Sequence, residues 1–222
     1  MTIAFSLLTF RAPHTRADRI LWLLHELNVP FELKAYKRAF VPEVKSVSPL
    51  GKIPVVDIYY VDGSKQQICE TGYVVWFLIK HYGISQPVLP VKDSDFEQML
   101  SYIHYCEGTF AQFAMNLFVK KLTKSEVPTA PDKVYYNPNM KLNMNYIEGL
   151  MKEQHEKSSN YLVGNTLTPA DIIFFTYLHV MFIHSLVDKA EYPHVYQWYE
   201  QLKKEPGYLY CVEYGKSQLS KM

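Results

Sequence analysis

The stretch Gly51-Lys52-Ile53-Pro54-Val55-Val56 places a proline directly before an apolar strand segment. Proline cannot donate a hydrogen bond to a strand ladder, so it is tolerated only at a sheet edge or a bulge. A cis peptide bond before Pro54 turns the chain sharply and points the backbone N–H and C=O of Ile53 outward. We therefore expect these two groups to be available to the peptide backbone of a ligand.

A second part of the same candidate site is Glu70-Thr71-Gly72, where an acid and a hydroxyl stand at a predicted helix start. A helix N-terminus can hold a ligand carboxylate, and Glu70 can meet a ligand ammonium. Together with Ile53 and Pro54, these residues predict a site for a small, zwitterionic, peptide-like molecule.

The composition is that of an ordinary soluble globular protein, with 48% hydrophobic and 20% charged residues in a chain of 222. Lys and Arg number 23 and Asp and Glu 22, so no net field favours nucleic acid or an anionic membrane as a partner. The scattered Cys69, Cys106 and Cys211 favour a reducing compartment over a disulfide framework. Neither the cysteines nor the histidines have metal-binding spacing, so no metal site is predicted.

Targeting signals are weak in this sequence. The N-terminus lacks the basic region and cleavage site of a signal peptide, and the apolar runs are too short to span a membrane. We therefore expect a cytoplasmic protein without a membrane span. The C-terminal Ser220-Lys221-Met222 differs by one residue from the peroxisomal address Ser-Lys-Leu, which makes the peroxisome the alternative and a frayed polar tail the simpler interpretation.

Residues 1–84 predict a small α/β domain with the βαβ-α-ββα order of a thioredoxin-like fold. Thr15 is the expected N-cap of its first helix, with Asp18 completing a capping box. The Asp62-Gly63 turn joins two strands of a hairpin, and Gly83 closes the helix that begins at Glu70. The predicted strands cover residues 3–10, 31–36, 53–60 and 66–69, and the helices residues 16–27, 41–47 and 70–82.

Residues 93–222 predict an all-α domain after a linker that carries Pro87 and Pro90. The apolar positions recur at helical spacing in each of its segments. A loop with three prolines runs from Ser125 to Pro138. The predicted helices lie near residues 93–122, 139–159, 169–187, 193–204 and 206–219.

Several strings, in this order and at these spacings, resemble the glutathione transferase superfamily over nearly the whole chain. The N-terminal strings are residues 15–24, 48–54 and 70–72, and the C-terminal one is residues 168–172 after Tyr161-Leu162-Val163-Gly164. Within the superfamily the chain is most similar to the fungal, yeast-type transferases. The residues that carry this likeness are His14-Thr15-Arg16-Ala17, Tyr36-Lys37-Arg38 and Cys106-Glu107-Gly108.

The resemblance implies that reduced glutathione binds with its thiol at the start of the first helix. Thr15 stands where the family has serine or cysteine, and its hydroxyl would hydrogen bond the thiolate and lower a thiol pKa that is ordinarily ~8.5. The helix N-terminus would favour the same anion. The alternative is that Thr15 serves only as an N-cap. His14 and Arg16 are further candidates for a donor or a positive charge near the sulfur.

The other glutathione contacts are implied by the same resemblance. Ile53 and Pro54 would pair with the backbone of the cysteinyl unit. Glu70 would meet the γ-glutamyl ammonium and Thr71 the carboxylate beside it, although both residues can also serve only to start the helix. The candidates for the glycyl carboxylate are Lys52 and, as substitutes, Lys37 and Arg38.

An apolar electrophile is expected between the domains, against the first helix of the all-α domain. Tyr102, Tyr105, Cys106 and Phe110 are the candidate wall residues, and a plain core stripe is the alternative for them. We expect Cys106 to be buried and inert. Thr168 and Asp171 form a capping box whose role is folding.

The expected activity is conjugation of glutathione to apolar electrophiles, with glutathione-dependent peroxidase activity at the same site and a role in detoxification and oxidative stress. Glutathione is the co-substrate and no further cofactor is expected. A homodimer is implied by the resemblance. Two alternatives remain: a non-catalytic binding or regulatory protein, and thiol–disulfide exchange, which predicts a cysteine where Thr15 stands.

Overall fold

The computed structural model describes residues 2–10, 15–36, 42–48, 50–84, 86–125 and 127–220. The chain forms two compact units. The first unit comprises the chain up to Gln86 and again from Glu205 onward, and the second comprises Pro87–Lys204.

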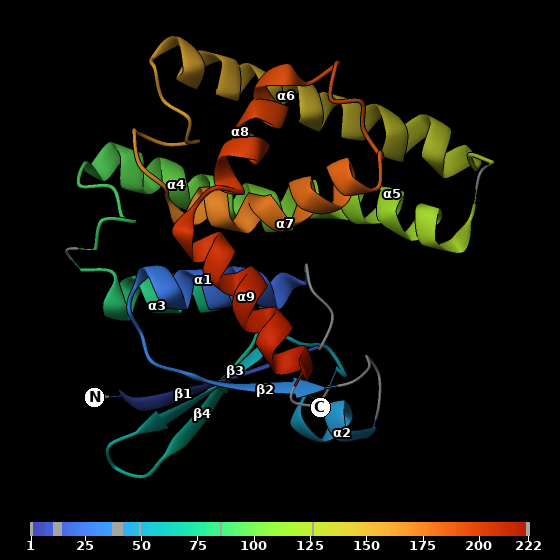
Figure 1. Ribbon diagram of the computed structural model, residues 1–222. Coiled ribbons are helices and arrows are strands. Elements are labelled where there is room, and N and C mark those ends of the chain that lie inside the picture. The colour runs from blue at the N-terminus through green and yellow to red at the C-terminus, as the bar shows by residue number, and fades with distance from the viewer. Residues whose placement is uncertain are drawn as a thin grey trace. The chain divides into compact units, whose positions relative to one another are not determined.

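Among the described residues, the first unit is built on a mixed sheet of four strands in the order β2-β1-β3-β4 (Figure 1). β1 runs parallel to β2 and antiparallel to β3, and β4 pairs antiparallel with β3. A helix joins the parallel pair, as a parallel connection requires. The strands are β1 (Thr2–Phe10), β2 (Glu32–Tyr36), β3 (Val55–Tyr60) and β4 (Lys65–Ile68).

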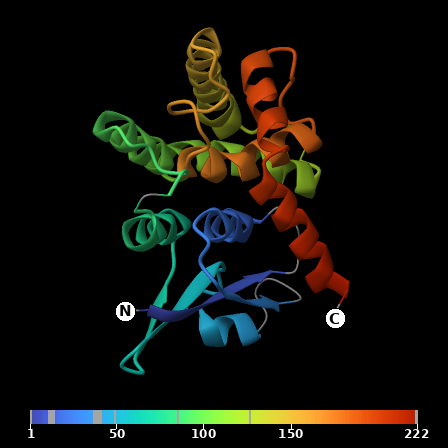
Figure 2. The ribbon, with the colours of Figure 1, turned by 60° about the vertical axis from the view of Figure 1, so that its left-hand side comes forward.

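The helices of this unit cover both faces of the sheet. α1 (Arg16–Glu26) and α3 (Thr71–Tyr82) pack side by side on one face, and α2 (Pro42–Val47) lies on the other (Figures 1 and 2). Leu23 and Leu24 of α1, Leu78 of α3 and Ile58 of β3 are almost fully buried. The order β1-α1-β2-α2-β3-β4-α3 confirms the predicted thioredoxin-like order.

The last helix, α9 (Pro206–Ser220), packs along α1 in the first unit. The ring of Tyr208 lies 5.8 Å from that of Trp22, and Tyr210 stacks on His25 at 4.3 Å. Gly207 allows the approach, because a Cβ there would collide with the Trp22 indole and the Glu26 carboxylate. We expected this helix in the all-α domain of residues 93–222, whereas the structure groups it with the first unit.

The second unit is entirely helical over its described residues. α7 is buried on nearly all sides, which explains why its sequence is apolar throughout. Two π-helical turns, η1 and η2, interrupt the helices. The elements are α4 (Asp93–Tyr105), η1 (Cys106–Phe110), α5 (Ala111–Thr123), η2 (Asp132–Tyr136), α6 (Asn137–Glu156), α7 (Pro169–Ile183) and α8 (Pro193–Leu202).

The expected loop from Ser125 to Pro138 differs from the structure in its second half. Pro131 precedes the turn η2, and α6 already begins at Asn137, with Pro138 in its first turn. The helical run begins at residue 130 and continues through η2 into α6, so Pro138 stands inside it, directly after the π-helical turn. The prolines of this segment therefore do not keep it in a loop. The single helix expected over residues 93–122 is two helices joined by η1.

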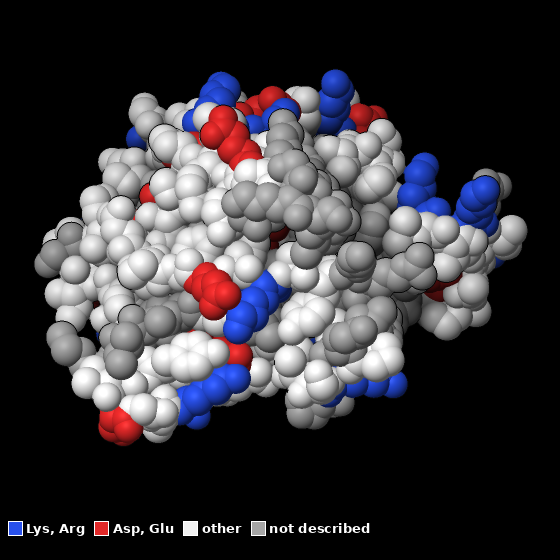
Figure 3. Space-filling view, turned by 60° about the horizontal axis from the view of Figure 1, so that its bottom comes forward, with Lys and Arg blue, Asp and Glu red and all other residues white. Residues whose placement is uncertain are grey.

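Charged side chains of both signs are interspersed on the face shown in Figure 3. This mixture agrees with the near-equal numbers of basic and acidic residues in the sequence. None of the helices that the structure describes has the length and apolarity needed to cross a bilayer.

Candidate functional site

Strand pairing brings three parts of the candidate site to one edge of the sheet. Leu8 pairs with Val55, so the end of β1 lies beside the start of β3. Val56 pairs with Ile68, so the end of β4 lies beside the same start. The chain passes from β1 toward α1, enters β3 from Ile53–Pro54 and leaves β4 into α3. The three motifs, which are far apart in the sequence, therefore gather at this edge.

The start of α1 has the predicted capping box. Thr15 is the N-cap in an extended conformation, and its backbone N–H donates to Asp18 Oδ2 at 3.0 Å. Its Oγ1 accepts a hydrogen bond from the Ala17 N–H at 3.3 Å. An oxygen that accepts this bond keeps its own O–H proton, so the half-buried hydroxyl can still donate to an anion placed before the helix.

The first turn of α1 is contacted by α9. The Cys211 Sγ lies 3.9 Å from the backbone oxygen of Asp18 and donates to it. Burial raises the pKa of the Cys211 thiol, and the carboxylates of Asp18 and Glu26 raise it further. Cys211 is therefore an inert packing residue next to the capping box rather than a second nucleophile.

The second part of the site is the turn that leads into β3. The Ile53–Pro54 peptide bond is cis, and Ile53 precedes the first residues that pair in the ladders, Val55 with β1 and Val56 with β4. Gly51 has a φ of 63°, a conformation that glycine adopts without steric cost. The turn is tied down by Ser48, whose Oγ accepts from the backbone N–H of Lys52 at 3.2 Å.

The third part is the start of α3. Glu70 has a φ of 66° and a ψ of 110°, which is a sparsely populated conformation for a residue with a side chain. Its side chain is exposed and forms no capping hydrogen bond with the described residues. The first amides of α3 are therefore open to an anion. Thr71, the first residue of the helix, is 5% exposed.

The remaining residues of the predicted site fall into two groups. Arg16 and Lys52 are both exposed, the first at the start of α1 and the second in the turn before Ile53. The others lie outside the described residues, and the structure says nothing of them. They are His14, Lys37 and Arg38, together with the last two residues of the C-terminal tripeptide, Lys221 and Met222.

The four candidate acceptor-wall residues lie within the second unit and face its core. Cys106 and Phe110 are fully buried, and the Cys106 Sγ donates to the Ile173 oxygen of α7 at 3.7 Å. Tyr105 donates to Asn143 Oδ1 of α6 at 2.6 Å. Tyr102 accepts from Gln98 Nε2 at 2.9 Å, and burial raises its pKa to about 12. Packing accounts for these contacts, and a wall role remains a prediction.

The capping box at α7 is far more enclosed than the one at α1. Asp171 Oδ2 accepts from the backbone N–H and the hydroxyl of Thr168, at 2.8 and 2.7 Å. Its Oδ1 accepts from the Leu162 N–H at 2.8 Å and from Trp198 Nε1 at 3.0 Å. Burial raises the pKa of Asp171 to about 6, against the lowering effect of these four bonds.

Two features of the site carry a weak signal or none in the sequence. The strained Glu70 backbone has none, because glutamate has no preference for positive φ. The hydrogen bond from the Lys52 N–H to Ser48 Oγ has only a weak signal, which is a hydroxyl residue four positions before Lys52. Metal binding has no support in the part of the chain that the structure describes, where no group of three or more His, Cys, Asp or Glu side chains could hold an ion.

A thioredoxin-like unit with this site, combined with an all-helical unit, is the architecture of glutathione transferases. A family model described as "Glutathione S-transferase, C-terminal domain" matches residues 107–208. Glutathione S-transferase 1 of Saccharomyces cerevisiae is 29% identical over 218 residues, which cover 92% of this chain and 93% of that protein. Glutathione S-transferase 3 of Schizosaccharomyces pombe is 28% identical over 172 residues, 71% of this chain and 67% of that protein.

The solved structures agree on the fold. Ure2p in complex with glutathione superposes with a TM-score of 0.77 at 19% identity, covering 93% of this chain and 97% of that one. Residues 107–208 thus match the glutathione S-transferase C-terminal domain, and the chain is similar over most of its length to glutathione transferases, those of two yeasts among them.

Proposed function

We propose that this protein is a glutathione S-transferase that adds the glutathione thiolate to apolar electrophiles. One observation carries the proposal: the start of α1, the residue before Pro54 and the start of α3 gather at one edge of the sheet. Glutathione, a γ-glutamyl tripeptide, has three groups that match these three parts of the site: a thiol for the start of α1, a peptide backbone for Ile53 and a zwitterionic end for the start of α3. The fungal transferases to which the chain is similar support the same assignment.

The zwitterionic end of glutathione binds at α3 in this account. The open amides at the helix start receive the carboxylate, with the Thr71 hydroxyl as a further donor. The exposed Glu70 carboxylate pairs with the ammonium. The positive φ of Glu70 aims its backbone and side chain away from regular helical geometry, and strain of this kind is concentrated at ligand sites. Lys52 then receives the glycyl carboxylate.

Thr15 acts on the thiol. Its Oγ1 accepts from the Ala17 N–H, so its hydroxyl proton can be donated to a sulfur placed before the helix. The hydrogen bond and the positive end of α1 both stabilise the thiolate over the thiol. Attack on an aryl halide then forms a C–S bond as the carbon–halogen bond breaks and the halide leaves, and the thiol proton passes to solvent. The same thiolate can attack the terminal oxygen of an organic hydroperoxide, which breaks the O–O bond and releases an alcohol. The resulting glutathione sulfenic acid reacts with a second glutathione to give glutathione disulfide and water, so glutathione is the reductant of this peroxidase activity.

The rival function is that of a protein which binds glutathione without turnover. Retention on immobilised glutathione, measured beside conjugation of a chromogenic aryl halide, separates the two. We expect retention and turnover in the wild type. Turnover should fall by about 100-fold in Thr15→Val and be kept in Thr15→Ser, the size of effect seen when one donor to a developing anion is removed.

Each outcome of this experiment has a definite meaning. Retention without turnover in the wild type makes the protein a binder, and no retention contradicts the glutathione site itself. Equal turnover in wild type and Thr15→Val moves thiol activation to the α1 backbone amides, to Arg16 or to His14. Retention of Thr15→Val on the matrix shows that the substitution acts on chemistry and not on folding.

A homodimer in the cytoplasm completes the proposal, with a role in detoxification and oxidative stress. Light scattering of the purified protein measures the mass, which should be twice that of the 26.0 kDa chain. A fluorescent fusion at the N-terminus leaves Ser220-Lys221-Met222 free, so diffuse fluorescence supports the cytoplasm and puncta that depend on this tripeptide support the peroxisome.

A further inference from the structure

The start of α8 is held on α6 by two polar contacts within the helical unit. Glu148 of α6 accepts a hydrogen bond from the backbone N–H of His194 at 3.1 Å and another from that of Val195 at 2.9 Å. Beside this cap, Nδ1 of His155, also on α6, lies 2.7 Å from Nδ1 of His194. Both rings are half-buried, and neither belongs to the proposed glutathione site.

The distance between the two Nδ1 atoms requires one proton between them. At 2.7 Å the nitrogens are hydrogen bonded, so one of them carries the proton and the other accepts it. A pair of neutral rings meets this condition, and so does a pair in which one ring is charged. In a doubly charged pair both nitrogens carry a proton, and the two N–H groups point at each other. The contact therefore tolerates one charge and not two.

The surroundings of His155 resist the second charge. Its Nε2 is buried and has no hydrogen-bond partner among the described residues, so a charged ring leaves an N–H there without an acceptor. Burial lowers the pKa of His155 below the ordinary 6.5, and the His194 ring lowers it further. Glu148 acts in the opposite direction, but both of its oxygens are already bonded to the first amides of α8.

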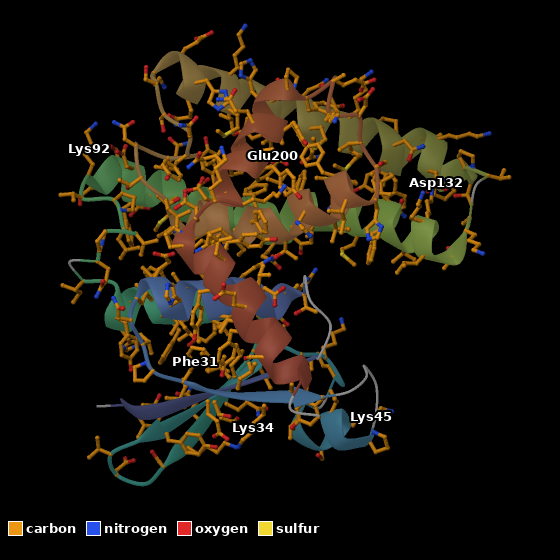
Figure 4. The ribbon with its side chains drawn as sticks, in the orientation of Figure 1. Phe31, Lys34, Lys45, Lys92, Asp132 and Glu200 are labelled. Carbon is orange, nitrogen blue, oxygen red and sulfur yellow. The ribbon has the colours of Figure 1, made fainter. Side chains whose placement is uncertain are left out.

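The other ionisable groups near α8 are engaged elsewhere. Burial raises the pKa of Tyr192, just before the helix, and Glu191 raises it further, so this phenol stays neutral. The Asp171 carboxylate of α7 is occupied by its four hydrogen bonds. Glu200, labelled on α8 in Figure 4, pairs with Lys203 at 3.0 Å. The charged groups that act on the pKa of the ring on α6 are therefore those already named, the partner ring and the carboxylate that caps α8.

We propose that the His155–His194 contact is a pH-sensitive latch, which holds the start of α8 on α6 near neutral pH and releases it in acid. When the start of α8 is released, water surrounds both rings and each can take its own proton, so the second proton favours release. The contact is fully present above about pH 6.5 and is lost as the pH falls through the lowered pKa of His155. The apolar residues of α8 stay buried in the helical core, so the release concerns the first turn of the helix.

The latch responds to pH in the opposite sense to Asp171, which accepts from Trp198 of the same helix. Burial raises the pKa of Asp171 to about 6, so the stabilisation from that carboxyl is lost as the pH rises. The stabilisation from the histidine pair is lost as the pH falls. The direction of a pH effect on the start of α8 therefore tells the two groups apart.

Hydrogen–deuterium exchange of the backbone amides of α8, in the purified full chain, tests the latch. Protection in the first turn of α8, taken relative to the intrinsic exchange rate at each pH, should be about fivefold lower at pH 5 than at pH 7, as expected when one side-chain hydrogen bond is lost. His155→Gln keeps a hydrogen-bonding partner for His194 but cannot be charged, so its protection should no longer fall in acid. His104→Gln, which changes an exposed histidine of α4, should keep the wild-type response.

The contrary outcomes are equally definite. Equal protection at pH 5 and pH 7 in the wild type overturns the proposal, and so does a wild-type response in His155→Gln. Lower protection at pH 7 than at pH 5 also overturns it, because that is the direction that Asp171 gives. Loss of the response in His104→Gln would show that the effect is not specific to the pair. If His155→Gln does not fold, His194→Gln makes the same test from α8, where the ring is half-buried.

Discussion

The same four-residue pattern, Thr-x-x-Asp, starts α1 and α7, in two very different surroundings. At α7 the box is closed: Thr168 and Asp171 are fully buried, and the Thr168 hydroxyl gives its proton to the carboxylate. At α1 the box is open: Thr15 is half-buried, and its oxygen accepts from Ala17. The pattern sets the helix start in both places, and the surroundings decide whether the threonine has a proton left for a ligand.

The largest expected effect comes from emptying the closed box. Asp171→Ala leaves four donors without an acceptor, three from backbone or hydroxyl groups and one from the Trp198 indole. We expect the free energy of unfolding to fall by about 4 kcal/mol, because each buried unsatisfied donor carries a desolvation penalty. Urea unfolding measures this free energy. A loss as small as that of an exposed helix cap would contradict the difference between the closed and the open box.

The closed box also predicts a pH dependence. Burial raises the pKa of Asp171 from 3.8 to about 6, so the folded chain holds the proton at pH values where the unfolded chain has released it. The stabilisation is fully present below about pH 4 and is lost as the pH rises through about 6, by up to about 3 kcal/mol. Urea unfolding at several pH values should show this slope in the wild type but not in Asp171→Asn, and a rise in stability over this range would contradict it.

The helix that the open box starts, α1, depends for its packing on α9. Gly207→Ala drives a Cβ into Trp22 and Glu26 and should cost about 2 kcal/mol, as overpacking does. Gly215→Ala, on the same helix with open space around it, is the matched control and should be neutral or slightly stabilising. If the two variants unfold alike, α9 does not brace α1, and the description of the open box loses its support.

Much of the first unit could be predicted from the sequence, because its signals are local. The Thr15–Asp18 box, the Asp62-Gly63 turn and the proline before β3 each depend on a few neighbouring residues. The sheet-edge location of the site then follows from the strand order. The Glu70 backbone could not be predicted, since its positive φ is imposed by the surrounding fold and not by its side chain.

The side-chain packing of the second unit could not be predicted from the sequence, because it depends on contacts between distant residues. The helical spacing of its apolar residues predicts the helices themselves. Which side chains become buried, and against what, depends on helices distant in sequence. Cys106 donates to Ile173 of α7 and Tyr105 donates to Asn143 of α6, so both candidate wall residues pack on helices distant in sequence, and their wall role stays a prediction. The packing of α9 on α1 also joins residues far apart in the sequence, and it requires that Gly207 has no side chain.

The pKa of the thiol of bound glutathione reports directly on whether the Thr15 hydroxyl stabilises the thiolate. It is read from the ultraviolet absorbance of the thiolate during a pH titration of the complex. We expect a pKa well below the ~8.5 of a free thiol in wild type and Thr15→Ser, and a value about one unit higher in Thr15→Val. The same pKa in wild type and Thr15→Val would show that the Thr15 hydroxyl does not stabilise the thiolate, and would make the open box no more than a helix cap.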